Sequence, residues 1–185
     1  AWNYETGVRY TPWEGMRVDF NLYRIDFDDQ IVYNATTDRF DNLGSTRHQG
    51  FETDIFWTPQ AMRDLDLHAG YAYLDAKQRN GTYTDNEVPY SSRNQFMVDA
   101  RYRFAEHWTY NLDGLYISKA YTDAANTRDE NASASVGELP AYWVWNTAVE
   151  REFPLADKSV LTASAGISNL FNREYYFRGI DTAPW

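Results

Sequence analysis

The feature that most constrains this chain is a period of two, because apolar and polar side chains alternate along most of its 185 residues. Successive side chains of a β-strand point to opposite faces, so this alternation predicts strands with one apolar and one polar face. The clearest run covers residues 94–104, where Phe96 and Val98 alternate with Asp99 and Arg101. No run shows the 3.6-residue period of a helix, and the chain is therefore predicted to be all-β and antiparallel.

About eight strands are predicted in this way. Their ranges are 3–11, 16–34, 47–58, 64–76, 94–104, 107–119, 141–153 and 160–176. In the second range the apolar residues change parity, from Val18 and Leu22 to Ile25 and Phe27. Such a change indicates either a β-bulge or the end of the apolar band.

The connections between these strands alternate in length. Short turns are predicted at 12–15, 59–63, 105–106 and 154–158, and long loops at 35–46, 77–93 and 120–140. Transmembrane β-barrels have short turns on the periplasmic side and longer loops on the extracellular side. The regular sorting of these connections therefore favours a membrane barrel over a soluble β-sandwich.

Aromatic residues support the same interpretation. The chain has 15 Tyr, 10 Phe and 7 Trp, although its mean hydropathy is −0.67. Rings near the short turns, such as Trp57, Trp108 and Phe153, indicate an aromatic girdle at one membrane interface. Tyr71, Tyr73 and Tyr116 are predicted to form the opposite girdle.

Composition excludes several functions. The chain has no cysteine, which excludes disulfides and thiol chemistry, and its net charge of −10 argues against a nucleic-acid partner. No run approaches about 18 apolar residues, so no transmembrane helix is expected. Neither a G-x-S-x-G nor an H-E-x-x-H motif is present, and the chain is not predicted to be an enzyme or to hold a cofactor or metal.

The chain opens inside a predicted strand and ends in a predicted loop, so we expect it to be a fragment. Open strand edges are not viable in lipid, because unpaired backbone groups there are costly. The strands must therefore close on themselves or belong to a larger barrel. A passive porin or small structural barrel, and a soluble ligand-binding barrel, remain the alternatives at this point.

Five segments, taken in order, resemble the TonB-dependent outer-membrane receptors. They are NYETGVRY at 3–10, LYRIDFDDQI at 22–31, RHQGFE at 47–52, VPYSSRN at 88–94 and GISNLFNREYY at 166–176. The fourth departs from the family pattern, because Ser92 stands where a second proline is usual. Residues 121–142 look most similar to the ferric-dicitrate-type branch.

The resemblance implies a 22-stranded barrel closed by an N-terminal plug domain. Residues 1–185 would be the C-terminal part of the barrel domain, without the plug and the final strand. The family likeness implies uptake of a ferric siderophore or similar metal chelate, energised by the TonB complex through the plug. It also implies residence in the outer membrane of a Gram-negative bacterium, in contact with its lipid and lipopolysaccharide.

Two groups of residues are candidates for function. Polar residues expected to face the barrel interior should pair with one another and with the plug; they are Glu52, Asp54, Asp99, Arg101, Arg103, Asn111 and Asp113. Arginines and aromatics in the loops suit an anionic chelate; the candidates are Arg47, His48, Arg79, Tyr83, Arg93, Tyr121, Arg128 and Arg178. Each of the latter could equally be an ordinary solvated loop residue.

Two further interpretations concern metals. Asp123, Asp129 and Glu130 lie in the longest loop and could bind a divalent cation instead. The three histidines, His48, His68 and His107, lack a metal-binding spacing and are interpreted as structural.

Overall fold

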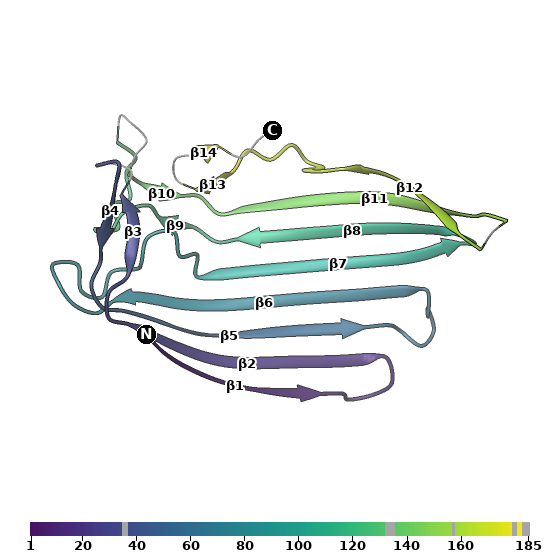
Figure 1. The fold of residues 1–185 in the computed structure, drawn as a ribbon, viewed down its shortest axis with the longest axis horizontal. Coiled ribbons are helices and arrows are strands. Elements are labelled where there is room, and N and C mark those ends of the chain that lie inside the picture. The colour runs from purple at the N-terminus through teal and green to yellow at the C-terminus, as the bar shows by residue number, and fades with distance from the viewer. Residues whose placement is uncertain (35–36, 132–135, 157, 179–180, 183–185) are drawn as a thin grey trace.

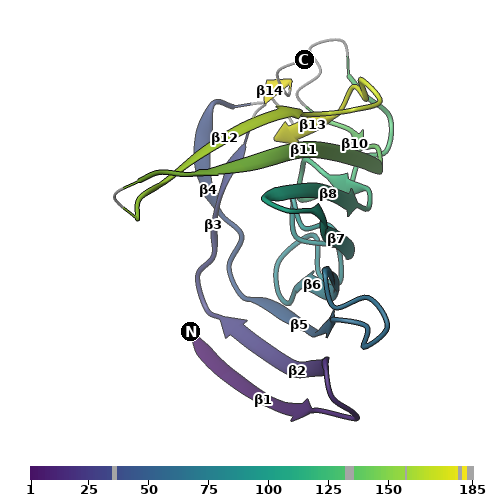
Figure 2. The same ribbon diagram turned by 90° about the vertical axis from the view of Figure 1, so that its right-hand side faces the viewer.

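The dominant element is a single antiparallel sheet of eight strands in the order β1-β2-β5-β6-β7-β8-β11-β12. The computed structural model describes residues 1–34, 37–131, 136–156, 158–178 and 181–182, and gives residues 176–178 and 181–182 by their backbone only. The eight strands are β1 (Trp2–Tyr10), β2 (Met16–Phe27), β5 (Thr46–Trp57), β6 (Leu65–Gln78), β7 (Asn94–Ala105), β8 (Trp108–Ile117), β11 (Tyr142–Pro154) and β12 (Val160–Ile167). Figure 1 shows them side by side, and Figure 2 shows that the sheet is curved.

Three small two-stranded pieces complete the described part. They are β3 (Ile31–Asn34) with β4 (Arg39–Asn42), β9 (Ala120–Tyr121) with β10 (Glu138–Leu139), and β13 (Tyr176–Arg178) with β14 (Asp181–Thr182). The first four gather at one end of the sheet, which we call the long-loop end; the short turns lie at the opposite, short-turn end (Figure 1). The predicted all-β, antiparallel fold is confirmed. The described residues contain no helix of a length and apolarity that would cross a membrane.

Two of the predicted strands end well before the predicted residue. β2 stops at Phe27, and its ladder with β5 runs from Met16↔Trp57 to Phe27↔Thr46 without a shift in register. The parity change in this strand is therefore the end of the apolar band and not a bulge. β12 stops at Ile167 because Asn169 and Asn172 adopt left-handed turn conformations, with φ of 51° and 49°.

Register gives the sheet two chemically different faces. Val98 pairs with Ala69 on one side and with Gly114 on the other, and Gly114 pairs with Trp145. Directly paired residues share a face, so these residues belong to one surface, which we call the apolar face. The alternate positions form the polar face.

The apolar face is not a dry protein core. The sheet is a single layer, and edge-strand side chains such as Val8 and Leu161 are 60% and 57% exposed. The residues Phe96, Val98, Leu112, Trp145 and Ala163 therefore share an open surface instead of meeting across an interior.

Gly114 shows how closely the apolar face is packed. A Cβ placed at this position would lie 2.6 Å from Cζ3 of Trp145. The indole therefore lies directly on the backbone of β8, and any side chain at position 114 would displace it.

Aromatic rings form two belts on the apolar face, as predicted. Near the short turns, Phe104 lies 6.3 Å from Tyr102 and 6.2 Å from Trp108 between ring centroids. The belt nearer the long-loop end includes Phe51 stacked on Tyr73 at 5.7 Å. It continues through Phe51–Tyr71, Tyr116–Trp143, Phe96–Trp143 and Trp143–Trp145. The two belts bracket a zone of smaller side chains.

The buried residues of the described chain are concentrated at the long-loop end. They include Ala76, Val88, Ala120 and Val144 among the apolar residues, and Thr46, Gln78 and Thr122 among the polar ones. By strand parity Ala76 and Val144 belong to the polar face, so the loops fold over that face at this end.

Candidate functional site

The polar face carries a network of charged side chains in mid-sheet. His68 lies between two carboxylates, with Nε2 2.8 Å from Asp54 Oδ1 and Nδ1 2.9 Å from Asp99 Oδ2. The His68 ring stacks on the Phe56 ring, with 4.4 Å between the ring centroids. The Arg17 guanidinium lies over the same Phe56 ring, 4.1 Å from its centroid. Four strands thus contribute to one polar cluster.

The network continues toward the short-turn end. The Arg103 Nη1 atom donates to Asp66 Oδ2 at 2.8 Å, and the Asn111 amide donates to Glu150 at 3.0 Å. Arg101 lies 3.9 Å from the same Glu150. Six of the seven residues predicted to pair do so with other polar side chains of the same face: Asp54 and Asp99 with His68, Arg101 and Asn111 with Glu150, Arg103 with Asp66, and Asp113 with Asn146 at 2.6 Å.

The second candidate region is the loop cluster, defined as residues 79–93, 118–131 and 136–141. Its two long loops are joined through the side chain of Asn126. The Oδ1 atom of Asn126 accepts from the Glu87 amide at 2.7 Å, and its Nδ2 donates to the Glu87 carbonyl at 2.9 Å. One side-chain amide thus satisfies both the backbone N–H and the backbone C=O of a residue 39 positions away.

Further contacts reinforce this connection. The buried Gln78 side chain donates to the Ala124 carbonyl at 2.8 Å, and the Asn86 amide donates to the same oxygen at 3.0 Å. The Tyr90 backbone amide donates to the Tyr121 carbonyl at 2.7 Å. Separating the two loops would leave these polar groups without partners, and buried polar groups are normally hydrogen-bonded. The contacts therefore hold the two loops together as one unit.

Two titratable groups of the loop cluster have pKa values above their ordinary ones. Burial raises the pKa of the Tyr90 phenol above its ordinary value, and the nearby charge of Asp123 adds to the effect. A hydrogen bond to Glu138, with 2.6 Å between Nζ and Oε2, raises the pKa of the Lys119 ammonium. Both groups therefore keep their protons at neutral pH.

The β3–β4 hairpin is attached more loosely to the loop cluster. The Arg79 amide donates to the Ser45 carbonyl at 2.8 Å, and the Ser45 amide donates to Asn80 Oδ1 at 3.0 Å. Beyond this attachment the hairpin projects outward, and its Ile31 and Phe40 side chains are 67% and 75% exposed.

The predicted loop candidates are not all brought together. Arg79, with Nη1 3.2 Å from Asp85, and the exposed Tyr83 lie in the first loop, and Arg93 pairs with Glu87 at the end of that loop. Tyr121 and the exposed Arg128 lie in the second loop. These five residues belong to the loop cluster.

The other three candidates lie elsewhere. Arg47 has the parity of the apolar face and donates to Asp26 Oδ1 at 2.7 Å. His48 lies on the polar face at the base of the hairpin, with Nε2 2.9 Å from Gln30 Oε1. Arg178 lies in β13, and its side chain is outside the part of the chain that the structure describes.

The sequence does not reveal the partners of the residues that hold these regions together. The interpretation of His68 as structural agrees with its place between two carboxylates, but those partners depend on the register of β5, β6 and β7. Asn126 adopts a left-handed conformation with φ of 56°, which asparagine tolerates better than most residues. No local pattern marks either residue, because their partners are distant in sequence.

The alternative cation site in the second loop is not supported by the geometry. Both carboxylate oxygens of Asp123 are used within the loop, by the amides of Ala125 and Thr127 and by the Thr127 hydroxyl. Within the described ranges, no three His, Asp or Glu side chains are grouped in a way that would hold a metal ion.

Comparison with known proteins assigns this architecture to a family. The family described as TonB dependent receptor-like, beta-barrel, matches residues 1–170. The metal-pseudopaline receptor CntO of Pseudomonas aeruginosa is 31% identical over an alignment of 186 positions, which covers 95% of this chain and 24% of the receptor. The chain thus spans about a quarter of the length of this relative.

Solved structures agree with the family match. The unliganded ferric citrate transporter FecA superposes with a TM-score of 0.80 at 29% identity, over 94% of this chain and 26% of that one. The siderophore receptor PiuA of Acinetobacter baumannii shares the fold, with a TM-score of 0.70 at 17% identity over 95% of this chain and 25% of that one.

Proposed function

Because the chain belongs to the TonB-dependent receptor β-barrel family, we propose that it forms part of the barrel wall of an outer-membrane receptor for a metal chelate. The family match covers residues 1–170, and the chain is a fragment of a larger barrel. The observation that carries the proposal is the division of the sheet into an open apolar face and an internally paired polar face, with ordered loops at one end.

Each part of the wall has a role in this proposal. The apolar face, with its two aromatic belts, contacts the lipid of the outer membrane and its lipopolysaccharide. The long-loop end lies outside the cell. The polar face lines the interior, where His68 is paired with Asp54 and with Asp99, and the two carboxylates offer their remaining hydrogen-bonding capacity to the plug domain. That domain connects to the TonB complex, which energises transport.

Two relatives, at 31% and 29% identity, support a metal chelate as the transported ligand. One is named for metal-pseudopaline and the other for ferric citrate. We propose that Arg79, Tyr83, Arg93, Tyr121 and Arg128 of the loop cluster contribute to capture, because guanidinium groups and rings suit an anionic complex. Arg47 is left out of this set, since it lies on the opposite face of the wall.

A binding panel with the full-length receptor tests the proposal. Quenching of tryptophan fluorescence would be measured with ferric citrate, with metal-pseudopaline, and with ferric catecholates and hydroxamates. Saturable binding of at least one chelate is expected, with uptake in cells that depends on TonB. Uptake that is linear in concentration and independent of TonB would instead support the passive porin. A full-length protein that stays soluble without detergent would support the soluble barrel.

A further inference from the structure

Three side chains of the polar face form a bridge across β5, β6 and β7. His68 on β6 lies with Nε2 2.8 Å from Asp54 Oδ1 and with Nδ1 2.9 Å from Asp99 Oδ2. Asp99 is the direct cross-strand partner of His68, whereas Asp54 lies diagonally across from it, one row nearer the long-loop end. One ring therefore connects two strands that do not pair with each other.

The two contacts fix the number of protons in this bridge. A neutral imidazole has one N–H group and one nitrogen lone pair, and an ionised carboxylate can only accept. With a neutral ring, one of the two contacts would bring the lone pair against a carboxylate oxygen. Both contacts are hydrogen bonds only when the bridge holds one further proton, and the ring takes it, because histidine is a much weaker acid than aspartic acid. His68 is therefore an imidazolium that donates to Asp54 and to Asp99.

The surroundings of the ring suit a positive charge. His68 stacks on Phe56 with 6° between the ring planes, and an aromatic face attracts a cation. The Arg17 guanidinium lies over the same Phe56 ring but pairs with Asp19 at 3.2 Å. The other charged groups near the bridge nearly balance one another; they are Arg17 and Asp19 on β2, Glu52 on β5, Asp66 on β6, Arg101 and Arg103 on β7, and Asp113 on β8. The two carboxylates of the bridge therefore depend on the ring for a positive partner.

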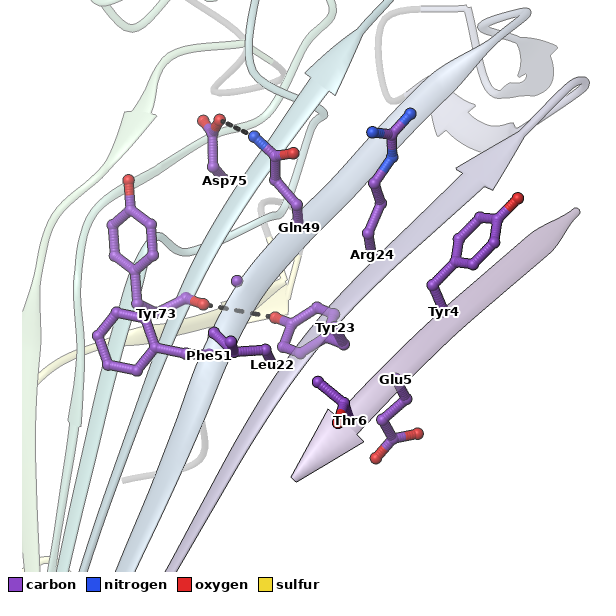
Figure 3. Close-up of a pocket in the computed structure, with 11 residues that line it drawn as sticks. Tyr4, Glu5, Thr6, Leu22, Tyr23, Arg24, Gln49, Phe51, Tyr73 and Asp75 are labelled. Carbon is purple, nitrogen blue, oxygen red and sulfur yellow. Dashed lines mark hydrogen bonds between the residues drawn. The ribbon is translucent and has the colours of Figure 1, made fainter. Parts of the chain in front are cut away.

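Two other side-chain contacts to β6 keep their protonation state near neutral pH. The Tyr23 hydroxyl donates to the Tyr73 carbonyl at 3.5 Å, and the Gln49 amide donates to Asp75 at 3.3 Å (Figure 3). A phenol titrates at about pH 10 and a carboxyl group at about pH 4, and an amide does not titrate. Histidine, by contrast, is the side chain whose charge changes between about pH 5 and 8. The bridge at His68 is therefore a contact of this wall that can respond to pH.

We propose that His68 is a proton-operated latch in the interior wall of the barrel. While the ring carries both protons, it holds β5 and β7 together and offsets one of the two carboxylates. When one proton leaves to the water of the interior, one hydrogen bond is lost and the bridge gains one unit of negative charge. The side chains of His68, Asp54 and Asp99 are 19%, 38% and 42% exposed, so the proton can leave without opening of the wall.

The latch regulates passage of the ligand and not its capture. The inference rests on the proposed function, because that function makes the polar face the surface along which an anionic chelate moves. A further negative charge in the middle of the wall repels an anion, so passage is faster while His68 is protonated. Capture takes place on other residues, in the loop cluster, and does not depend on this proton.

The first test follows the proton directly in the full-length receptor, purified in detergent. The hydrogen on C2 of an imidazole exchanges with deuterium at a rate that depends on ring protonation, and mass spectrometry of peptides resolves each histidine. At about pH 7, His68 should be an imidazolium in the native receptor and a largely neutral ring in the double variant Asp54→Asn with Asp99→Asn. The control, Glu52→Gln with Asp113→Asn, removes as much charge from the same face but no partner of His68, and should match the native receptor.

The second test compares uptake by cells that carry the native receptor or His68→Gln, with ferric citrate and metal-pseudopaline as probes. The ratio of the maximal rates, native over variant, cancels the effects of pH on the energy source and on the probe. It should be roughly three- to tenfold at about pH 6 and fall to about one at about pH 9, because glutamine is uncharged throughout. His68→Lys keeps a positive charge and should transport like the protonated native receptor at both pH values. Half-saturation should be the same in all three, and heat-dependent gel mobility checks that each barrel is folded.

Three results would overturn the inference. They are a neutral His68 ring at about pH 7 in the native receptor, an exchange profile that is the same in the native receptor and the double variant, and a ratio of uptake rates that does not change with pH. In each case, saturable binding and TonB-dependent uptake that persist would show that only this inference has failed. Absence of saturable uptake of both probes would show that the proposed function has failed, and the exchange profile would still decide the protonation of His68.

Discussion

In the wall formed by the eight long strands, side chains on both faces are open, and even Val8 and Leu161 are more than half exposed. At the long-loop end, by contrast, Val88 and Thr46 are each 1% exposed, and side-chain amides bind backbone groups far away in sequence. The stability of the wall therefore depends on the medium that surrounds it, whereas the stability of the loop cluster depends on contacts within the chain. Substitutions in the wall should change its solvation, and substitutions in the loop cluster should change its internal hydrogen bonds.

The largest expected effect tests the dependence of the wall on lipid. Val98→Arg places a charge in the middle of the apolar face and should destabilise the full-length barrel by about 2–4 kcal/mol, because an arginine at mid-membrane is costly to solvate. Unfolding by urea from lipid vesicles, followed by tryptophan fluorescence, measures the change.

Met97→Arg is the matched control for this substitution, since Met97 is the adjacent residue on the polar face of the same strand. It should cost much less, because that face is lined with polar groups. Similar losses of unfolding free energy for the two variants would show that the apolar face does not contact lipid.

The second prediction concerns the internal contacts of the loop cluster. Asn126→Gly keeps the left-handed backbone but removes both hydrogen bonds to Glu87, so opening of the two loops should become easier by about 1–3 kcal/mol. Hydrogen exchange of the Glu87 amide, followed by mass spectrometry, reports this change.

The β3–β4 hairpin is the internal control, because its described contacts to the cluster run through Ser45 and not through Asn126. Its exchange should be unchanged. If exchange at Glu87 is unaltered in the variant, the two loops are not held together by this side chain.

A third, smaller effect is expected on ligand affinity. Arg128 is exposed on the second loop, so Arg128→Gln should weaken binding of the preferred chelate by roughly tenfold without changing stability, because one charge-assisted contact is lost. Titration of tryptophan quenching measures the affinity, with Arg39→Gln as the control of equal charge. Identical affinities for native protein and Arg128→Gln would remove this residue from the proposed capture set.

The smallest effect is a pH dependence confined to the loop cluster. The pKa of Lys119 is raised above its ordinary value of 10.5 by Glu138. A raised pKa means that the contribution is fully present below the ordinary pKa and is lost as the pH rises through the folded-state pKa. Loop protection should therefore be level from about pH 6 to 9 and decline only at higher pH.

Lys119→Gln should abolish that decline while leaving the exchange of the wall strands unchanged. A fall in loop protection between neutral pH and pH 9 would contradict the assignment, and would point to a different titrating group in the cluster.

The sequence predicted the wall better than it predicted the loops. All eight long strands were found, because alternation recurs within each strand and depends only on neighbouring residues. The errors lie at two strand ends. The predicted second strand extended past Phe27 into a separate hairpin, and the eighth passed through the asparagine turn that follows Ile167. In the first case the chain becomes extended again but β3 pairs with β4 and not with the large sheet. In the second case the chain turns at Asn169 and Asn172.

Local pattern thus determined which side chains share a face, where the aromatic belts lie, and to which family the chain is similar. The tertiary structure alone decided register, and register sets Asp54, His68 and Asp99 side by side and groups Arg47 with Asp26 and Lys77. It also decided that Asn126 would join two loops. The physical reason is that alternation is a property of a few consecutive residues, whereas these pairings join positions far apart in the chain and exist only once the strands are aligned.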